Sequence, residues 1–151
     1  MAVNRRTFSV AAEDVWSVVA DGHLYGDWVT GTSGIRAVDA FFPEQGARIH
    51  YVVGRGPIRH EGHTEVLDVA AGRQMVLEAH AWPLGTAYIR IDIVPDGADR
   101  ASVTLTEHPH RGLARRLHNR LFDWLLQLRN AETLRRLERV AREQAKQAAQ
   151  A

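Results

Sequence analysis

Glu107 and Arg129 are the residues of this sequence best suited to holding a polar group in a buried place. Val103, Leu105 and Glu107 alternate within a predicted strand, so Glu107 should share the inward face of its two apolar neighbours. A buried carboxylate needs a partner, and Arg129 in the following predicted helix is the candidate. The pair is either a structural ion pair that joins strand to helix or a polar anchor for a ligand oxygen.

His50 and Tyr51 are neighbours on another predicted strand and must therefore point to opposite faces. If His50 faces inward, it could donate a hydrogen bond or act as an acid or base near neutral pH. If Ile49, Tyr51 and Val53 face inward instead, His50 is simply exposed. Both arrangements stay open, and His50, Tyr51 and Glu107 are the candidates for moving protons in a reaction.

The histidines do not predict a metal site. His60 and His63 are three residues apart on a predicted strand, so their side chains should point to opposite faces. The chain has no cysteine, which excludes thiolate ligands, disulfides and thiol catalysis. We therefore expect neither a metal ion nor a cofactor.

The charge of the chain is nearly balanced, with 19 Lys+Arg and 18 Asp+Glu, but it is unevenly distributed. Residues 111–151 hold 10 basic and 4 acidic side chains. The acids interrupt the arginines along this segment, so we expect a solvated helix face rather than a surface for nucleic acid. No apolar run reaches the length of a membrane span, and the N-terminal residues do not resemble a secretory signal, so we expect a cytoplasmic protein.

One long helix is predicted from residue 113 to about residue 144, which would measure roughly 45–50 Å. It contains no proline or glycine, and its apolar residues recur at three- and four-residue spacing on one predicted stripe: Leu113, Leu117, Leu121, Trp124, Leu128, Ala131 and Leu134. Residues 145–151 should form a frayed tail. A helix of this length needs a large apolar surface on which to lie.

The residues before it predict a sheet that could supply that surface. We expect strands at 3–10, 35–39, 47–53, 58–69, 73–81, 86–94 and 101–107, with two short helices between the first two strands. Residues 30–34 should be a loop and residues 108–110 a turn. Short connections favour an antiparallel sheet of about seven strands, with the long helix covering one face. The predicted fold class is α+β.

Short motifs along nearly the whole chain resemble the START/SRPBCC superfamily, which has the helix-grip fold. They are DVW at 14–16, YGDWV at 25–29, GARIH at 46–50, GRGP at 54–57, HTEVL at 63–67, VTLTE at 103–107 and RNAETL at 129–134. They are most similar to the polyketide cyclase/dehydrase-like branch. The resemblance implies a single domain over residues 1–144, in which a curved sheet wraps around the C-terminal helix and leaves a cavity. The superfamily includes lipid carriers, hormone receptors and cyclases, so the resemblance does not choose a reaction.

Three functions are compatible with this pattern. The leading one is binding of a small, mostly apolar molecule in the cavity, with Trp28 near its mouth. The second is a cyclase, aromatase or dehydratase that acts on a polyketide-like chain. The third is an interaction module that uses an apolar patch of the long helix, and a homodimer through Phe122 and Leu126 is one form of it. The expected ligand-binding residues are Trp28, His50, Tyr51, Ile89, Val103, Glu107, Trp124, Leu128 and Ala131.

Overall fold

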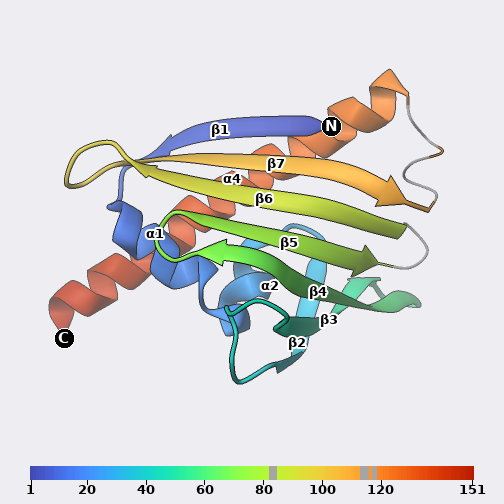
Figure 1. The fold of residues 1–151 in the computed structure, drawn as a ribbon, viewed down its shortest axis with the longest axis horizontal. Coiled ribbons are helices and arrows are strands. Elements are labelled where there is room, and N and C mark those ends of the chain that lie inside the picture. The colour runs from blue at the N-terminus through green and yellow to red at the C-terminus, as the bar shows by residue number, and fades with distance from the viewer. Residues whose placement is uncertain (82–84, 113–115, 117–118) are drawn as a thin grey trace.

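Seven strands of the computed structural model form one antiparallel sheet, which carries a long helix on one face (Figure 1). The structure describes residues 1–81, 85–112, 116 and 119–151. The strands are β1 (Ala2–Phe8), β2 (Thr32–Val38), β3 (Arg48–Arg55), β4 (Ile58–Ala70), β5 (Gln74–Ala81), β6 (Gly85–Pro95) and β7 (Ala101–Arg111). The helices are α1 (Ala12–Val19), the 3-10 turn η1 (Gly22–Leu24), α2 (Tyr25–Trp28) and α4 (Arg120–Gln150).

The sheet has the strand order β1-β7-β6-β5-β4-β3-β2, so only β1 lies out of sequence order. Register shifts interrupt the β2–β3, β4–β5 and β6–β7 pairings. Such irregularities bend strands and increase their twist. Figure 1 shows α4 crossing the sheet diagonally, with its C-terminal part beside α1. The predicted α+β helix-grip architecture is confirmed.

The C-terminal half of α4 packs into the main hydrophobic core. Leu134, Leu137, Val140 and Ala141 are buried there together with the inward side chains of α1 and the sheet. Glu138 attaches this half to the first strand, because it accepts hydrogen bonds from Arg6 Nε at 2.7 Å and from the Ser9 backbone N–H at 3.1 Å. Apolar packing and hydrogen bonds therefore both hold the helix to the sheet at this end.

The helix differs from the prediction in its end and in the face that it buries. Leu113 and Leu117 lie outside the described residues. The structure continues α4 to Gln150, where we expected a frayed tail after residue 144, and alanine, glutamine and lysine there are good helix formers. Three residues of the predicted buried stripe are exposed instead: Leu121 at 62%, Trp124 at 56% and Leu128 at 49%.

Strands β2 and β7 show the largest extensions beyond their predicted limits. β2 begins at Thr32, inside the expected loop at 30–34, and β7 runs to Arg111 through the expected turn at 108–110. The pairing of β1 with β7 ends at Ala2 and Glu107, so the last residues of β7 form a free edge on that side. Pro109 lacks a backbone N–H, and a sheet edge tolerates this because no ladder hydrogen bond is lost there.

Candidate ligand-binding cavity

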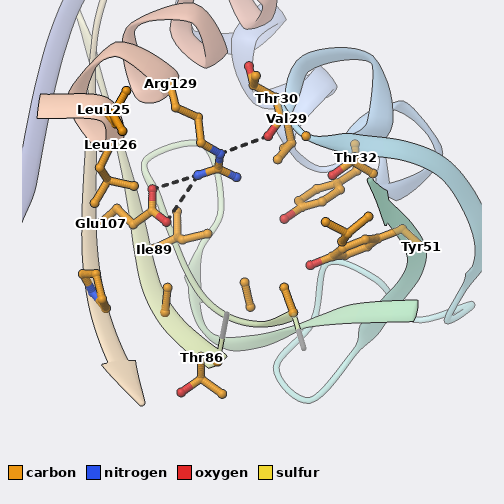
Figure 2. Close-up of a pocket in the computed structure, with 18 of the residues that line it drawn as sticks. Val29, Thr30, Thr32, Tyr51, Thr86, Ile89, Glu107, Leu125, Leu126 and Arg129 are labelled. Carbon is orange, nitrogen blue, oxygen red and sulfur yellow. Dashed lines mark hydrogen bonds and ion pairs between the residues drawn. The ribbon is translucent and has the colours of Figure 1, made fainter. Parts of the chain in front are cut away.

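A cavity of about 310 Å³ lies between the sheet and the N-terminal half of α4. Its walls come from the segment after α2, from strands β3, β5, β6 and β7, and from the first turns of the helix (Figure 2). This volume is within the range of small-molecule sites. The space is therefore large enough for a ligand with one or two rings.

The sizes of the residues on β5 and β6 explain why the space is at this end of the sheet. At the opposite end, the large side chains of Met75 and Ile91 are paired, and the next pair, Leu77–Ile89, lies at the border of the cavity, where Ile89 is part of the wall. Towards the cavity the pairs are Ala79–Ala87 and Ala81–Gly85. These short side chains cannot reach α4 across the curved sheet, so the interior stays unfilled.

The helix contributes Phe122, Leu125, Leu126 and Arg129 to the cavity wall. Their spacing of three, four and seven residues places them on one face of α4. Asn119 caps this end of the helix by accepting a hydrogen bond from the Phe122 backbone N–H at 2.8 Å. The wall is thus mostly apolar, with one cation in it.

Arg129 and Glu107 form the predicted ion pair, which the structure confirms. Arg129 Nη1 lies 3.0 Å from Glu107 Oε2 and 3.3 Å from Oε1. Arg129 Nε donates to the Thr30 carbonyl oxygen at 3.1 Å. Figure 2 shows the guanidinium projecting into the cavity between Glu107 and the aromatic side. The Glu107 side chain is only 9% exposed, so this is a nearly buried carboxylate with a fixed partner.

Two tyrosines on the other side of the cavity share one buried threonine. The Tyr51 hydroxyl lies 2.8 Å from Thr64 Oγ1, and the Tyr25 hydroxyl lies 3.0 Å from the same atom. The two rings stack with centroids 5.4 Å apart. Burial raises the pKa of both tyrosines, and it raises that of Tyr25 well above the usual value. Both phenols therefore stay protonated near neutral pH and serve as hydrogen-bond donors or acceptors, not as bases.

Trp28 lies deep in the fold and not at the cavity mouth, which corrects the prediction. It is only 3% exposed and packs edge-on against Tyr25. It lines a much smaller chamber of about 10 Å³, to which Glu107 and Arg129 also contribute. The chamber and the large cavity therefore share the ion pair as part of their walls.

His50 does not line the cavity, so its assignment as a ligand-binding residue is corrected. Ile49 and Tyr51 are buried on the concave side, and the pleat turns His50 to the outer face. There its ring lies 5.9 Å from that of His63, which in turn stacks on His80 at 4.4 Å. Neither His63 nor His80 lines the cavity either.

Of the residues predicted to bind a ligand, Tyr51, Ile89 and Glu107 line the cavity. Val103 does not, because it is fully buried in the core at the other end of β7. Trp124 and Leu128 point to solvent, and half-buried Ala131 lies outside the cavity wall. The side of the helix that faces the cavity carries residues 122, 125, 126 and 129, so these three residues lie on other sides of the helix.

The sequence analysis did not identify several residues that line the cavity, among them Tyr25, Thr30, Phe122, Leu125 and Leu126. It also missed Thr64, which does not line the cavity but forms hydrogen bonds with two tyrosines that do. The 122–125–126–129 spacing was a usable signal for the helix wall. Thr64 could also have been found, because it alternates with Gly62 and Val66 on the inner face of β4. No sequence signal joins Thr64 to the two tyrosines, since that contact depends on sheet curvature.

Among the described residues, no group of three or more His, Asp or Glu side chains is arranged to hold a metal ion. Within the same residues, no helix combines the length and the apolar character needed to cross a membrane.

The fold is shared with solved structures of low sequence identity. A conserved protein from Geobacillus kaustophilus has a TM-score of 0.72 and 13% identity, with 93% of this chain and 94% of that chain covered. The ZhuI aromatase/cyclase from Streptomyces sp. R1128 also has a TM-score of 0.72, with 16% identity and coverage of 95% and 94%. The di-domain ARO/CYC BexL from the BE-7585A biosynthetic pathway has a TM-score of 0.69 and 14% identity, and 93% of this chain covers 46% of BexL.

At these identities the likeness establishes the fold alone. No curated protein sequence matches the chain. A family model does match, however, over residues 2–142, which is nearly the whole length. On that match, together with the gripped helix and the cavity beneath it, this chain belongs to the polyketide cyclase/dehydrase and lipid transport family.

Proposed function

We propose that this protein binds a small, mostly apolar molecule in the cavity beneath α4. The observation that supports the proposal most is the cavity of about 310 Å³, whose mostly apolar wall includes alanine, valine, isoleucine, leucine and phenylalanine side chains. A few polar groups, chiefly Arg129, Glu107 and Tyr51, lie at fixed positions in that wall. Apolar walls with a few converging polar groups are typical of small-molecule sites.

The test is titration with the neutral fluorescent probe N-phenyl-1-naphthylamine. We expect saturable binding of one probe per chain. Ala87→Trp should abolish binding while the protein stays folded, because Ala87 lines the cavity. Leu128→Trp is the matched control, since Leu128 is exposed on α4 and its enlargement leaves the cavity unchanged. Absence of binding in the unaltered protein, or equal loss in both variants, would refute the proposal.

A second function, supported by the family match, is cyclase, aromatase or dehydratase activity on a polyketide-like chain. Glu107 and the Tyr51 hydroxyl both belong to the cavity wall, so a folded chain inside would contact a carboxylate and a phenol. Glu107 could accept a proton and the protonated Tyr51 could donate a hydrogen bond to a carbonyl oxygen, while the walls hold the chain in a reactive shape. Incubation with a linear poly-β-ketone thioester should then give cyclised product, and Glu107→Gln should slow its formation. Binding without turnover would leave only the carrier role.

A third function, an interaction module, is supported by the exposed apolar face of α4. Leu121, Trp124, Leu125 and Leu128 are each about half exposed or more. Their spacing of three, four and seven residues puts them on one side of the helix. Phe122 and Leu126, which the sequence predicted for a homodimer contact, line the cavity instead. The proposed partner is therefore a second copy of the chain that contacts the exposed face.

A further inference from the structure

The outer side of α4 carries apolar and then basic side chains along one line. The exposed apolar residues of its first turns are Leu121, Trp124, Leu125 and Leu128. Further along, at spacings of four, three and four residues, the exposed basic residues are Arg135, Arg139, Arg142 and Lys146. Leu121, Leu128 and Arg135 are each seven residues apart, which is about two helical turns. The apolar and the basic parts therefore share one side of the helix.

The four acids of α4 do little to interrupt this line. Glu138 is buried and already accepts two hydrogen bonds. Asp123 has one carboxylate oxygen buried. Glu132 lies between the two parts, but its carboxylate is paired with Arg136 Nε at 3.0 Å. Glu143 is exposed and stands against the four basic side chains, so the second part of the line has a surplus of positive charge.

The combination of the two parts fits an anionic lipid surface. Leucine and tryptophan side chains on one side of a helix bury at the boundary between headgroups and acyl chains, and tryptophan is enriched at this depth. Arginine and lysine beside them attract anionic headgroups. Contact with a second copy explains the apolar part alone, and contact with nucleic acid explains the basic part alone.

We propose that α4 docks lengthwise on an anionic membrane surface through this outer side. The apolar part inserts its side chains among the headgroups, and the basic part contacts the lipid phosphates. From Leu121 to Lys146 the contact is roughly 37 Å long at 1.5 Å per residue. Because the bilayer and a second copy use the same four apolar residues, binding to a bilayer should dissociate the dimer.

Flotation with lipid vesicles tests the docking. One set of vesicles is pure phosphatidylcholine, and the other contains about one third phosphatidylglycerol. We expect binding to the anionic vesicles, weakened by added salt because exposed charges are screened. The variant Arg135→Gln/Arg139→Gln/Arg142→Gln should bind more than tenfold more weakly, since each basic residue near an anionic surface contributes roughly a factor of five.

Three exposed arginines outside α4 supply the matched control. Arg55→Gln/Arg59→Gln/Arg73→Gln changes the net charge equally and should bind like the unaltered protein. Trp124→Ser tests the apolar part and should weaken binding severalfold. Val94→Ser is its control, because Val94 is 58% exposed on β6. A thermal melt of each variant verifies that it is folded.

The outcomes distinguish the membrane from the other partners. No binding to anionic vesicles, or equal weakening by the two arginine variants, would overturn the proposal. Binding that Trp124→Ser leaves unchanged would show adsorption by charge alone and would also overturn it. Tighter binding to duplex DNA than to the vesicles would assign the basic part to nucleic acid instead. None of these results affects the binding of N-phenyl-1-naphthylamine, so the docking and the proposed cavity function fail separately.

Discussion

Arg129 connects α4 to two other parts of the chain, the Thr30 carbonyl after α2 and the Glu107 carboxylate on β7. The two side chains of the ion pair differ in their exposure to solvent. The Glu107 side chain is 9% exposed, whereas that of Arg129 is 37% exposed. Removing the arginine side chain would therefore leave a buried carboxylate without a partner. Removing the glutamate side chain would leave a guanidinium that is still accessible to water.

We predict that Arg129→Ala destabilises the fold by about 3 kcal/mol or more, because it leaves a buried carboxylate unpaired. Glu107→Ala should cost less, about 1–2 kcal/mol. Free energies of unfolding in urea, measured for both single variants and the double variant, give the coupling. We expect the double variant to be more stable than the sum of the two losses implies, by about 1–3 kcal/mol. Strict additivity would show that the pair contributes nothing.

His63 on the outer face makes stability depend on pH. Burial, the neighbouring His80 and then Arg48 and His50 lower its pKa, with Glu65 opposing them. In the unfolded chain a histidine titrates near pH 6.5. Between the lowered folded pKa and about pH 6.5 the unfolded state binds more protons, so stability falls as the pH drops through that window.

The expected result is that His63→Gln flattens the decline in unfolding free energy between about pH 7 and pH 5. His23→Gln is the control, because His23 is an exposed histidine of η1 away from the outer-face rings. Urea unfolding at several pH values measures the slopes. Identical slopes for His63→Gln and the unaltered protein would contradict the prediction.

At the scale of elements, β3 and β4 are matched so that one glycine accommodates an aromatic ring. Tyr51 and Gly62 are directly opposite partners in this strand pair. A Cβ atom added at Gly62 would lie 2.9 Å from Tyr51 Cε2 and 3.0 Å from the His80 carbonyl oxygen. The absence of a side chain on β4 therefore lets the Tyr51 ring lie against the sheet and reach Thr64.

Gly62→Ala should destabilise the protein by about 1–3 kcal/mol through overpacking. It should also weaken binding of N-phenyl-1-naphthylamine, because the displaced Tyr51 ring is part of the cavity wall. Gly34→Ala is a matched control on β2, where an added Cβ meets nothing within 4 Å. Chemical denaturation measures the first effect, and fluorescence titration with the probe measures the second. A Gly62→Ala protein as stable as Gly34→Ala would show that the ring has room to move.

At the scale of the whole molecule, α4 has two apolar faces at its N-terminal half, one against the cavity and one in solvent. Figure 1 shows this end of the helix extending past β1 at the margin of the sheet. Leu125 belongs to both faces, since it lines the cavity and is 51% exposed. Contact with a second copy would therefore cover solvent-exposed leucines and close one side of the cavity.

We predict a concentration-dependent dimer through this face, measurable by sedimentation velocity. Leu128→Glu should shift the equilibrium to monomer, because it places a charge in the apolar contact. Val94→Glu is the control, since Val94 on β6 is 58% exposed but lies outside this face of α4. A protein that stays monomeric at all concentrations would exclude the dimer.

The alternation of residues along the strands predicted, without a structure, which side chains share a face of the sheet. Period-two alternation placed Glu107 inward with Val103 and Leu105, and it placed Ala87 and Ile89 on one face. In a strand, only two faces exist, so polarity usually suffices to assign them. The same rule left Tyr51 and His50 undecided, because both residue types are compatible with either face.

Only the tertiary structure decided which face of the helix is buried and where the cavity lies. Residues 121–128 read LFDWLLQL and are apolar around most of the helix, so no stripe in the sequence selects the buried face. Sheet curvature decided it, by bringing the short side chains at Ala79 and Ala87 beneath Phe122 and Leu126 and leaving space between them. The curvature also brought Thr64 to both tyrosines and placed Trp28 in the interior. Contacts between residues so far apart in the chain depend on the path of the whole sheet, which local periodicity does not encode.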